Sequence, residues 1–206
     1  MAASWGFVAT GAIATGTSLT VPVPAGIQSG DLLVILVAPN GSAASPTAGW
    51  TTLRSGVNLG AYYKFAGSSE SGVLFSGSSS SSAAVMAAYR GVGALDSVSV
   101  EATGFGLSPA TSSHATTHFT DDLVISFYGT TSGANGWTLP TGVTTRVVLN
   151  GTSLVAGFLL ADEDQAATGN TATRTAGLTT NSVQWGAIAA AFTAQPFMSF
   201  SDDLYF

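Results

Sequence analysis

The clearest hydrophobic pattern in the chain is the segment GDLLVILVA at residues 30–38. Successive side chains of a β-strand point to opposite faces, so a strand formed here is apolar on both faces. One face carries Leu32, Val34 and Leu36, and the other carries Leu33, Ile35 and Val37. The pattern therefore predicts a buried strand, and something must cover its second face.

Segments of this kind recur in the same order later in the chain, which predicts an internal duplication. The matching pairs are GDLLVILVA (30–38) with DDLVISFYG (121–129), GW at 49–50 with GW at 136–137, NLGAYYKFAG (58–67) with SLVAGFLLAD (153–162), and AAVMAAYRG (83–91) with GAIAAAFTA (186–194). The first pair places Leu123, Ile125 and Phe127 in a core shared with Leu32, Val34 and Leu36. The other face of the second copy carries Val124, Ser126 and Tyr128, and it is the more polar of the two outer faces.

Many short apolar segments separated by Gly-, Ser- and Pro-rich turns are typical of sandwiches and barrels. The Ala-rich segments at 83–89 and 186–192 have helical propensity, but their short length and their Gly, Ser and Thr neighbours favour tightly packed strands. Alternation at 17–26 predicts a further strand, and its prolines favour an edge position. The sequence thus predicts an all-β protein consisting of a single β-sandwich with a jelly-roll-like arrangement.

The predicted domain organisation follows from the repeat. The β-sandwich is expected to span residues 1–194, with repeat halves at about 17–103 and 108–194, and a C-terminal arm is expected at 195–206.

The second face of segment 30–38 has two possible covers. A loop or terminal segment of the same chain can lie over it, or a neighbouring subunit can bury it, and left wet it would form an unusual apolar patch. The C-terminal segment supplies a second surplus of apolar side chains. On the second alternative, which we favour, the interface residues are Leu33, Ile35, Val37, Phe197, Met198, Phe200, Leu204, Tyr205 and Phe206.

Composition narrows the classes of partner. Only 8% of residues are charged and the formal net charge is −6, with a single Lys. Nucleic acids and anionic membranes are not expected partners, because no basic cluster is present. The sequence begins without the charged region of a secretory signal, has no apolar run long enough to span a bilayer and contains no Cys, so we expect no signal peptide and no disulfide.

Few residues suggest chemistry. Asp162, Glu163 and Asp164 are weak candidates for Ca²⁺ binding, but a solvated turn explains them better because Ca²⁺ requires six or more oxygen ligands. His114 and His118 are expected at the surface, and Asp31 and Asp122 are expected to close turns before strands. We therefore expect no metal, no cofactor and no catalytic residue.

The run VPAGIQSGDLLVILVA (23–38), followed by GWTTL (49–53), AYYKFAG (61–67) and AAYRGV (87–92), resembles β-rich structural proteins of tailed bacteriophages. The resemblance covers the first hundred residues well and the second half more faintly. It is similar to virion decoration (cement) proteins and tail-associated proteins, which are non-enzymatic sandwiches assembled in many copies. The resemblance implies a virion structural protein that is assembled in the host cytoplasm as a homo-oligomer. It would bind preformed capsid or tail protein surfaces through apolar contacts and a terminal arm.

Two other functions remain open from the sequence. A tail-fibre or adhesin-type module would bind glycans by stacking sugars on Trp50, Trp137, Tyr62 and Tyr63. We favour a packing role for the two tryptophans, because a large ring with one polar atom suits the end of a sandwich. A hydrolase of unrecognised type is disfavoured by the scarcity of acidic residues and histidines.

Overall fold

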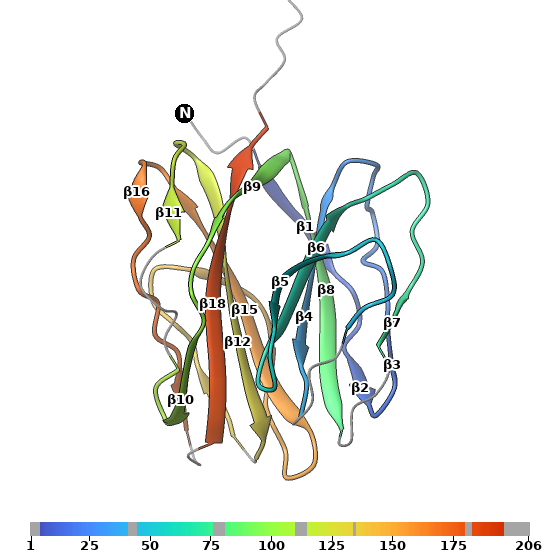
Figure 1. Ribbon diagram of the computed structural model, residues 1–206, viewed down its shortest axis with the longest axis vertical. Coiled ribbons are helices and arrows are strands. Elements are labelled where there is room, and N and C mark those ends of the chain that lie inside the picture. The colour runs from blue at the N-terminus through green and yellow to red at the C-terminus, as the bar shows by residue number, and fades with distance from the viewer. Residues whose placement is uncertain are drawn as a thin grey trace, which may run out of the picture.

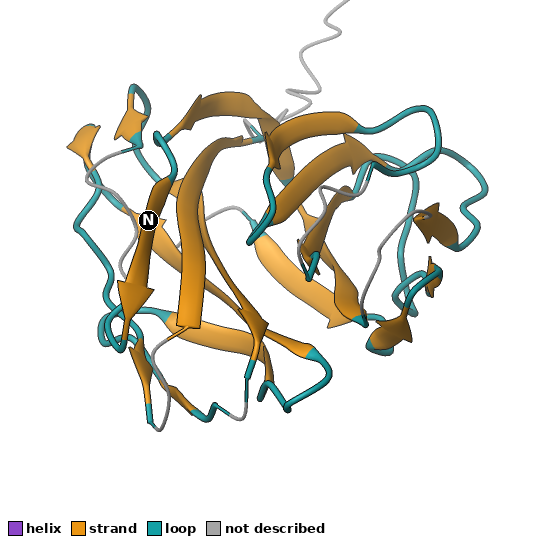
Figure 2. Ribbon diagram, turned by 60° about the horizontal axis from the view of Figure 1, so that its bottom comes forward, coloured by secondary structure: helices purple, strands orange, loops and turns teal. Residues whose placement is uncertain are grey.

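The computed structural model describes residues 5–40, 45–75, 81–109, 115–133, 135–179 and 183–195. These residues form strands and loops with no helix, so the predicted all-β sandwich is confirmed (Figure 2). The Ala-rich segments are central strands, as predicted. Within the described ranges there is accordingly no helix of the length and hydropathy that crossing a bilayer requires.

Two antiparallel sheets pack face to face (Figures 1 and 2). The first sheet contains, in spatial order, β1 (Gly6–Thr10), β8 (Ser82–Arg90), β4 (Leu32–Ala38), β6 (Gly60–Phe65) and β5 (Thr51–Ser55), with β2 (Ala14–Gly16) also paired to β8. The second contains β10 (Ala102–Gly106), β18 (Val183–Ala194), β12 (Asp122–Ser132), β15 (Ala156–Gln165) and β14 (Thr144–Leu149), with β9 (Val92–Val98) also paired to β18. Each half of the chain forms one sheet, so the jelly-roll connectivity is not confirmed.

The two sheets have the same internal order, which supports the predicted duplication. Leu32 of β4 pairs with Tyr89 of β8, and Leu123 of β12 pairs with Phe192 of β18. The alignments of 30–38 with 121–129 and of 83–91 with 186–194 therefore hold in register.

The predicted repeat boundaries need correction. The first sheet uses residues 6–90 and the second uses 92–194, in place of 17–103 and 108–194. Each half begins with its two edge strands. In the first half β1 and β2 pair with β8, and in the second half β9 and β10 pair with β18. These edge strands are rich in Gly, Thr and Ala and carry little hydrophobic period, so the pattern did not reveal them.

The core between the sheets contains the predicted residues. Leu32, Val34, Leu36, Leu123, Ile125 and Phe127 are all buried in one cluster, together with aromatic residues of β8, β15 and β18. At one lateral edge the sheets are joined by an ion pair between Arg54 and Glu101. At the other edge the Arg146 guanidinium lies 4.4 Å from the centre of the Phe7 ring.

Short ladders of the same chain cover both outer faces. β3 (Leu19–Val21) pairs with β7 (Val73–Phe75) over the first sheet. On the second sheet β11 (Thr116–Thr117) pairs with β16 (Gly169–Asn170), and β13 (Trp137–Thr138) pairs with β17 (Gly177–Leu178). The outer face of β12 is as dry as that of β4, since Val124, Ser126 and Tyr128 are buried, and the expected difference in polarity between the two faces is therefore not observed.

Candidate functional site

The outer face of β4 is not exposed to a partner. Leu33, Ile35 and Val37 are fully buried beneath the inward side chains of β3 and β7. An interface role for these three residues is therefore wrong, and the intramolecular alternative is the one observed. The cover escaped notice because β3 and β7 are three residues long and each contributes only two inward side chains.

The other part of the expected interface is the C-terminal arm. Its apolar residues, Phe197, Met198, Phe200, Leu204, Tyr205 and Phe206, lie outside the described residues. The last described residue, Gln195, donates its backbone N–H to the carbonyl of Gly91 at 2.8 Å.

The four aromatic candidates for glycan stacking do not form one platform. Tyr62 is buried against Phe75, and Tyr63 packs edge-on against Phe192 in the core. Trp50 packs on the outer cluster of the first sheet, whereas Trp137 packs on that of the second sheet. The predicted packing role holds for both tryptophans.

The ring nitrogen of Trp137 donates to the carbonyl of Leu149 at 3.0 Å, as expected for a large ring with one polar atom. The ring of Trp50 instead faces the Lys64 ammonium, 5.3 Å from its centre.

The acidic triplet at 162–164 lies on a strand and not in a turn, which corrects the sequence interpretation. Asp162 points into the sandwich and accepts from Arg146 at 2.6 and 3.0 Å. Glu163 points to the outer face and pairs with Arg174. Successive side chains on a strand point to opposite faces, so Glu163 cannot share one Ca²⁺ with Asp162 and Asp164. Among the described residues, no group of three or more acids, His or Cys is arranged to hold a metal ion.

The positive charges are all engaged. Each of the five Lys and Arg side chains contacts a carboxylate: Arg54 with Glu101, Lys64 with Glu70, Arg90 with Asp31, Arg146 with Asp162, and Arg174 with Glu163. Recognition of an anionic ligand by these cations would require breaking such a pair.

An apolar strip along β9 and β10 is a surface that the sequence analysis missed. It contains Val98 at the end of β9, Val100 in the link between the strands, Phe105 of β10 and Leu107 just after β10, with Val100 82% and Phe105 73% exposed. β10 is the edge strand of the second sheet, with its ladder formed on one side by β18 (Figure 1). No Lys protects this edge, although charged side chains commonly guard exposed strands. Sequence reasoning passed over the strip because Gly and Thr interrupt its apolar positions.

A second site that was missed lies at the end of the sandwich where β12 begins. Asp96 lies in a β-bulge of β9, and its two oxygens accept from the backbone N–H of His118 at 2.7 Å and from the His118 ring at 2.9 Å. Asp122 lies beside it and is fully buried, and its carboxyl group faces that of Asp96 and the backbone N–H of Phe119. Burial and the neighbouring Asp96 raise the pKa of Asp122 to about 7. Burial alone would raise the pKa of Asp96, but the bonds from His118 lower it.

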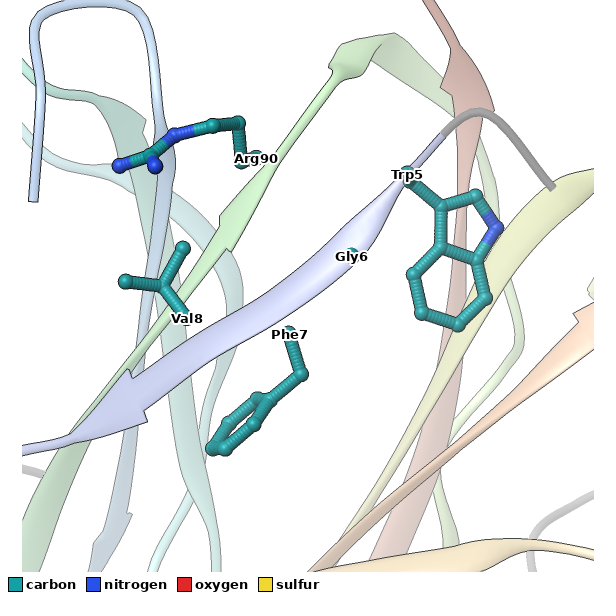
Figure 3. A pocket seen from close by; sticks show the side chains of 5 residues that line it. All are labelled: Trp5, Gly6, Phe7, Val8 and Arg90. Atoms are coloured by element: carbon teal, nitrogen blue, oxygen red, sulfur yellow. The ribbon is translucent and has the colours of Figure 1, made fainter.

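A hollow along β1 is lined by Trp5, Gly6, Phe7, Val8 and Arg90. Figure 3 shows Trp5 and Phe7 on one side of the strand and Val8 and Arg90 on the other. The hollow is therefore open surface around an edge strand. Its one ionisable side chain, Arg90, is already bound to Asp31 and to the carbonyl of Gly26.

Comparison with known proteins gives no relative, since no family model, no curated protein and no solved structure matches the chain.

Proposed function

We propose that this protein is a non-enzymatic structural protein of a tailed-bacteriophage virion, and that it decorates the capsid by binding a preformed protein surface. The observation that carries the proposal is the β9–β10 apolar strip, whose members are exposed on the two strands and beside them at one edge of the second sheet. The resemblance of the first hundred residues to decoration and tail-associated proteins supports the same function.

The chemistry of the surface favours a protein partner. An exposed apolar side chain such as Phe105 gains about 1.5–3 kcal/mol when it is buried at an interface. Within the described part of the chain β10 is the last strand of its sheet, so its outer side can add backbone hydrogen bonds to a strand of the partner. Because all Lys and Arg side chains are paired within the chain, few charges take part, and binding should tolerate salt.

The first test asks where the protein is found. Virions are purified from the phage or prophage genome that encodes the chain, and are analysed by mass spectrometry and antibody labelling. We expect many copies per particle, with label on the head. Absence from purified particles would overturn the proposed function, and label confined to the tail would replace capsid decoration with a tail role.

The second test asks which surface binds. Particles lacking the protein are mixed with purified chain and pelleted at low and high salt. The double variant Val100→Ser with Phe105→Ser should bind at least about tenfold more weakly, since two buried apolar side chains are lost and each 1.4 kcal/mol is tenfold. Leu154→Ser is the matched control, because Leu154 is 74% exposed but lies in the loop before β15. Equal binding by the double variant would refute the role of the strip.

A further inference from the structure

Asp31 and Asp122 occupy equivalent positions in the two halves of the chain, but their carboxyl groups have different partners. Asp31 directly precedes β4, and Asp122 is the first residue of β12. Asp31 receives two bonds from Arg90, at 3.0 and 2.8 Å, and one from the backbone N–H of Gln28 at 2.7 Å. The strand register places Thr193 opposite Asp122, where the first half has Arg90. Asp122 has therefore kept its buried position without the cation that balances Asp31.

Among the described residues, no Lys or Arg side chain faces Asp122, because all five are paired with other carboxylates. The titratable groups that face it are Asp96 from β9 and His118 from the segment after β11. β18 contributes Thr193 and β15 contributes Gln165, which are both uncharged. A bulge aims the Asp96 side chain at Asp122, and bulges commonly redirect side chains in this way.

Two carboxyl groups in contact cannot both be ionised at low cost, whereas one proton between them removes one charge and supplies a donor from one carboxyl group to the other. We propose that Asp96 and Asp122 hold one proton between them, and that loss of this proton releases residues 115–118 from the outer face of the second sheet. The inference is independent of the proposed virion function.

Residues 115–118 form a short segment that is held on the sheet mainly by hydrogen bonds to residues 167–171. Thr171 donates its backbone N–H to the Ala115 carbonyl at 3.0 Å, and the Thr116 and Thr117 hydroxyls donate to Asn170, Ala167 and Gly169 at 2.9–3.2 Å. Ala115 packs on Val124 and Ala189 of the sheet, and the β11–β16 ladder is two residues long. At its end the segment is held by the two bonds from His118 to Asp96. A second negative charge on Asp122 repels the carboxylate that makes both of these bonds.

The direction of titration agrees with this arrangement. The pKa of Asp122 is raised from 3.8 to about 7 in the folded protein, so the folded chain binds this proton more tightly than the unfolded chain does. Stability from this site is therefore present at low pH, and it falls as the pH rises through the window from about 4 to 7. The lowered pKa of Asp96 has the opposite effect on the pH dependence of stability. Because the two carboxyl groups interact, they titrate as a pair.

Two measurements test the proposal on the full chain. Carbon-13 NMR of the wild-type carboxyl groups should show one that titrates near neutral pH. Amide exchange at His118 and Thr171, whose N–H groups donate to Asp96 and to the Ala115 carbonyl, should lose about tenfold in protection, corrected for the intrinsic rate, between slightly acidic and slightly alkaline pH. In Asp122→Asn the amide donates to Asp96 at every pH, so protection should stay constant over the same range.

The matched control is Asp31→Asn in the first half. It should lower stability at all pH values, because it weakens a bonded ion pair, but it should leave the pH dependence at His118 and Thr171 intact. The proposal is overturned if every carboxyl titrates in the acidic range, or if Asp122→Asn keeps the wild-type pH dependence. It is also overturned if millimolar CaCl₂ restores protection at alkaline pH, since the pair would then be a cation site.

Discussion

Replacement of Ile35 by Ala tests whether the outer face of β4 is a core of the single chain. Ile35 is fully buried between its cross-strand neighbours Tyr62 and Met86, under the β3–β7 ladder. Truncation of a buried aliphatic side chain to Ala costs 2–5 kcal/mol, and the cost is lower where the surroundings can settle into the space. The ladder above Ile35 is short enough to settle partly, so we expect a loss of about 3 kcal/mol.

The assay is chemical and thermal unfolding of the purified chain at two protein concentrations. For a protein of this size the thermal midpoint should fall by about 6–12 °C. The loss should not depend on concentration, because the cover belongs to the same chain. Leu74→Ala is the matched control: Leu74 lies on β7 but is 46% exposed and faces away from β4, so it should cost much less. A concentration-dependent loss at Ile35, or equal losses for both variants, would refute the reasoning.

Three further predictions concern other parts of the chain. Gly129→Ala should destabilise by about 1–3 kcal/mol in urea unfolding, because its new Cβ would lie 2.4 Å from the carbonyl oxygen of Asn58, whereas Gly6→Ala, with open space around it, should be neutral. Trp137→Phe should cost about 1 kcal/mol in the same assay through loss of the bond that its ring donates to a carbonyl of β14, and an unchanged midpoint would contradict that contribution. Deletion of residues 197–206 should abolish particle pelleting while near-ultraviolet circular dichroism stays native, and retained pelleting would remove the arm from the proposed interface.

The sequence predicted the fold well in segments where the hydrophobic pattern and the flanking residues both indicate a strand. The apolar alternation of β4 and β12 identified the shared core, because a central strand in a two-layer sandwich must bury one face against the other sheet. The Ala-rich β8 and β18 were recognised from their flanks and length, against their helical propensity, since tertiary packing decides for such segments.

The same reasoning failed where the structure depends on short or weakly patterned segments. In the repeat alignment, Trp50 was matched with Trp137, but Trp50 directly precedes β5 whereas Trp137 begins β13. The pairing register of the strands shows which residues of the two halves are equivalent. A short motif such as GW cannot show this, because an insertion in a loop can place the same motif before a different strand. The outer cover and the strip on β9 and β10 were missed for a related reason, since two or three apolar residues give no period to detect.

The Asp96–Asp122 pair, in contrast, could have been suspected from the sequence. Alignment of AAYRG with AAFTA already sets Arg90 against Thr193, while Asp31 and Asp122 match. An aspartate kept without its arginine needs another source of positive charge or a proton. This comparison of the two halves was the signal available, and it required only the register of two strands.

The duplication also supplies a direct repair. Thr193→Arg places a guanidinium at the position that Arg90 occupies beside Asp31, on the strand next to Asp122. An arginine within contact distance favours the ionised carboxylate, so the pKa of Asp122 should fall towards its ordinary range. The protein should then keep its stability as the pH rises through neutrality, and a plot of thermal midpoint against pH should flatten there. A midpoint that still declines as in the wild type would mean that the two halves are not equivalent at this position, and that Arg90 is no guide to what Asp122 lacks.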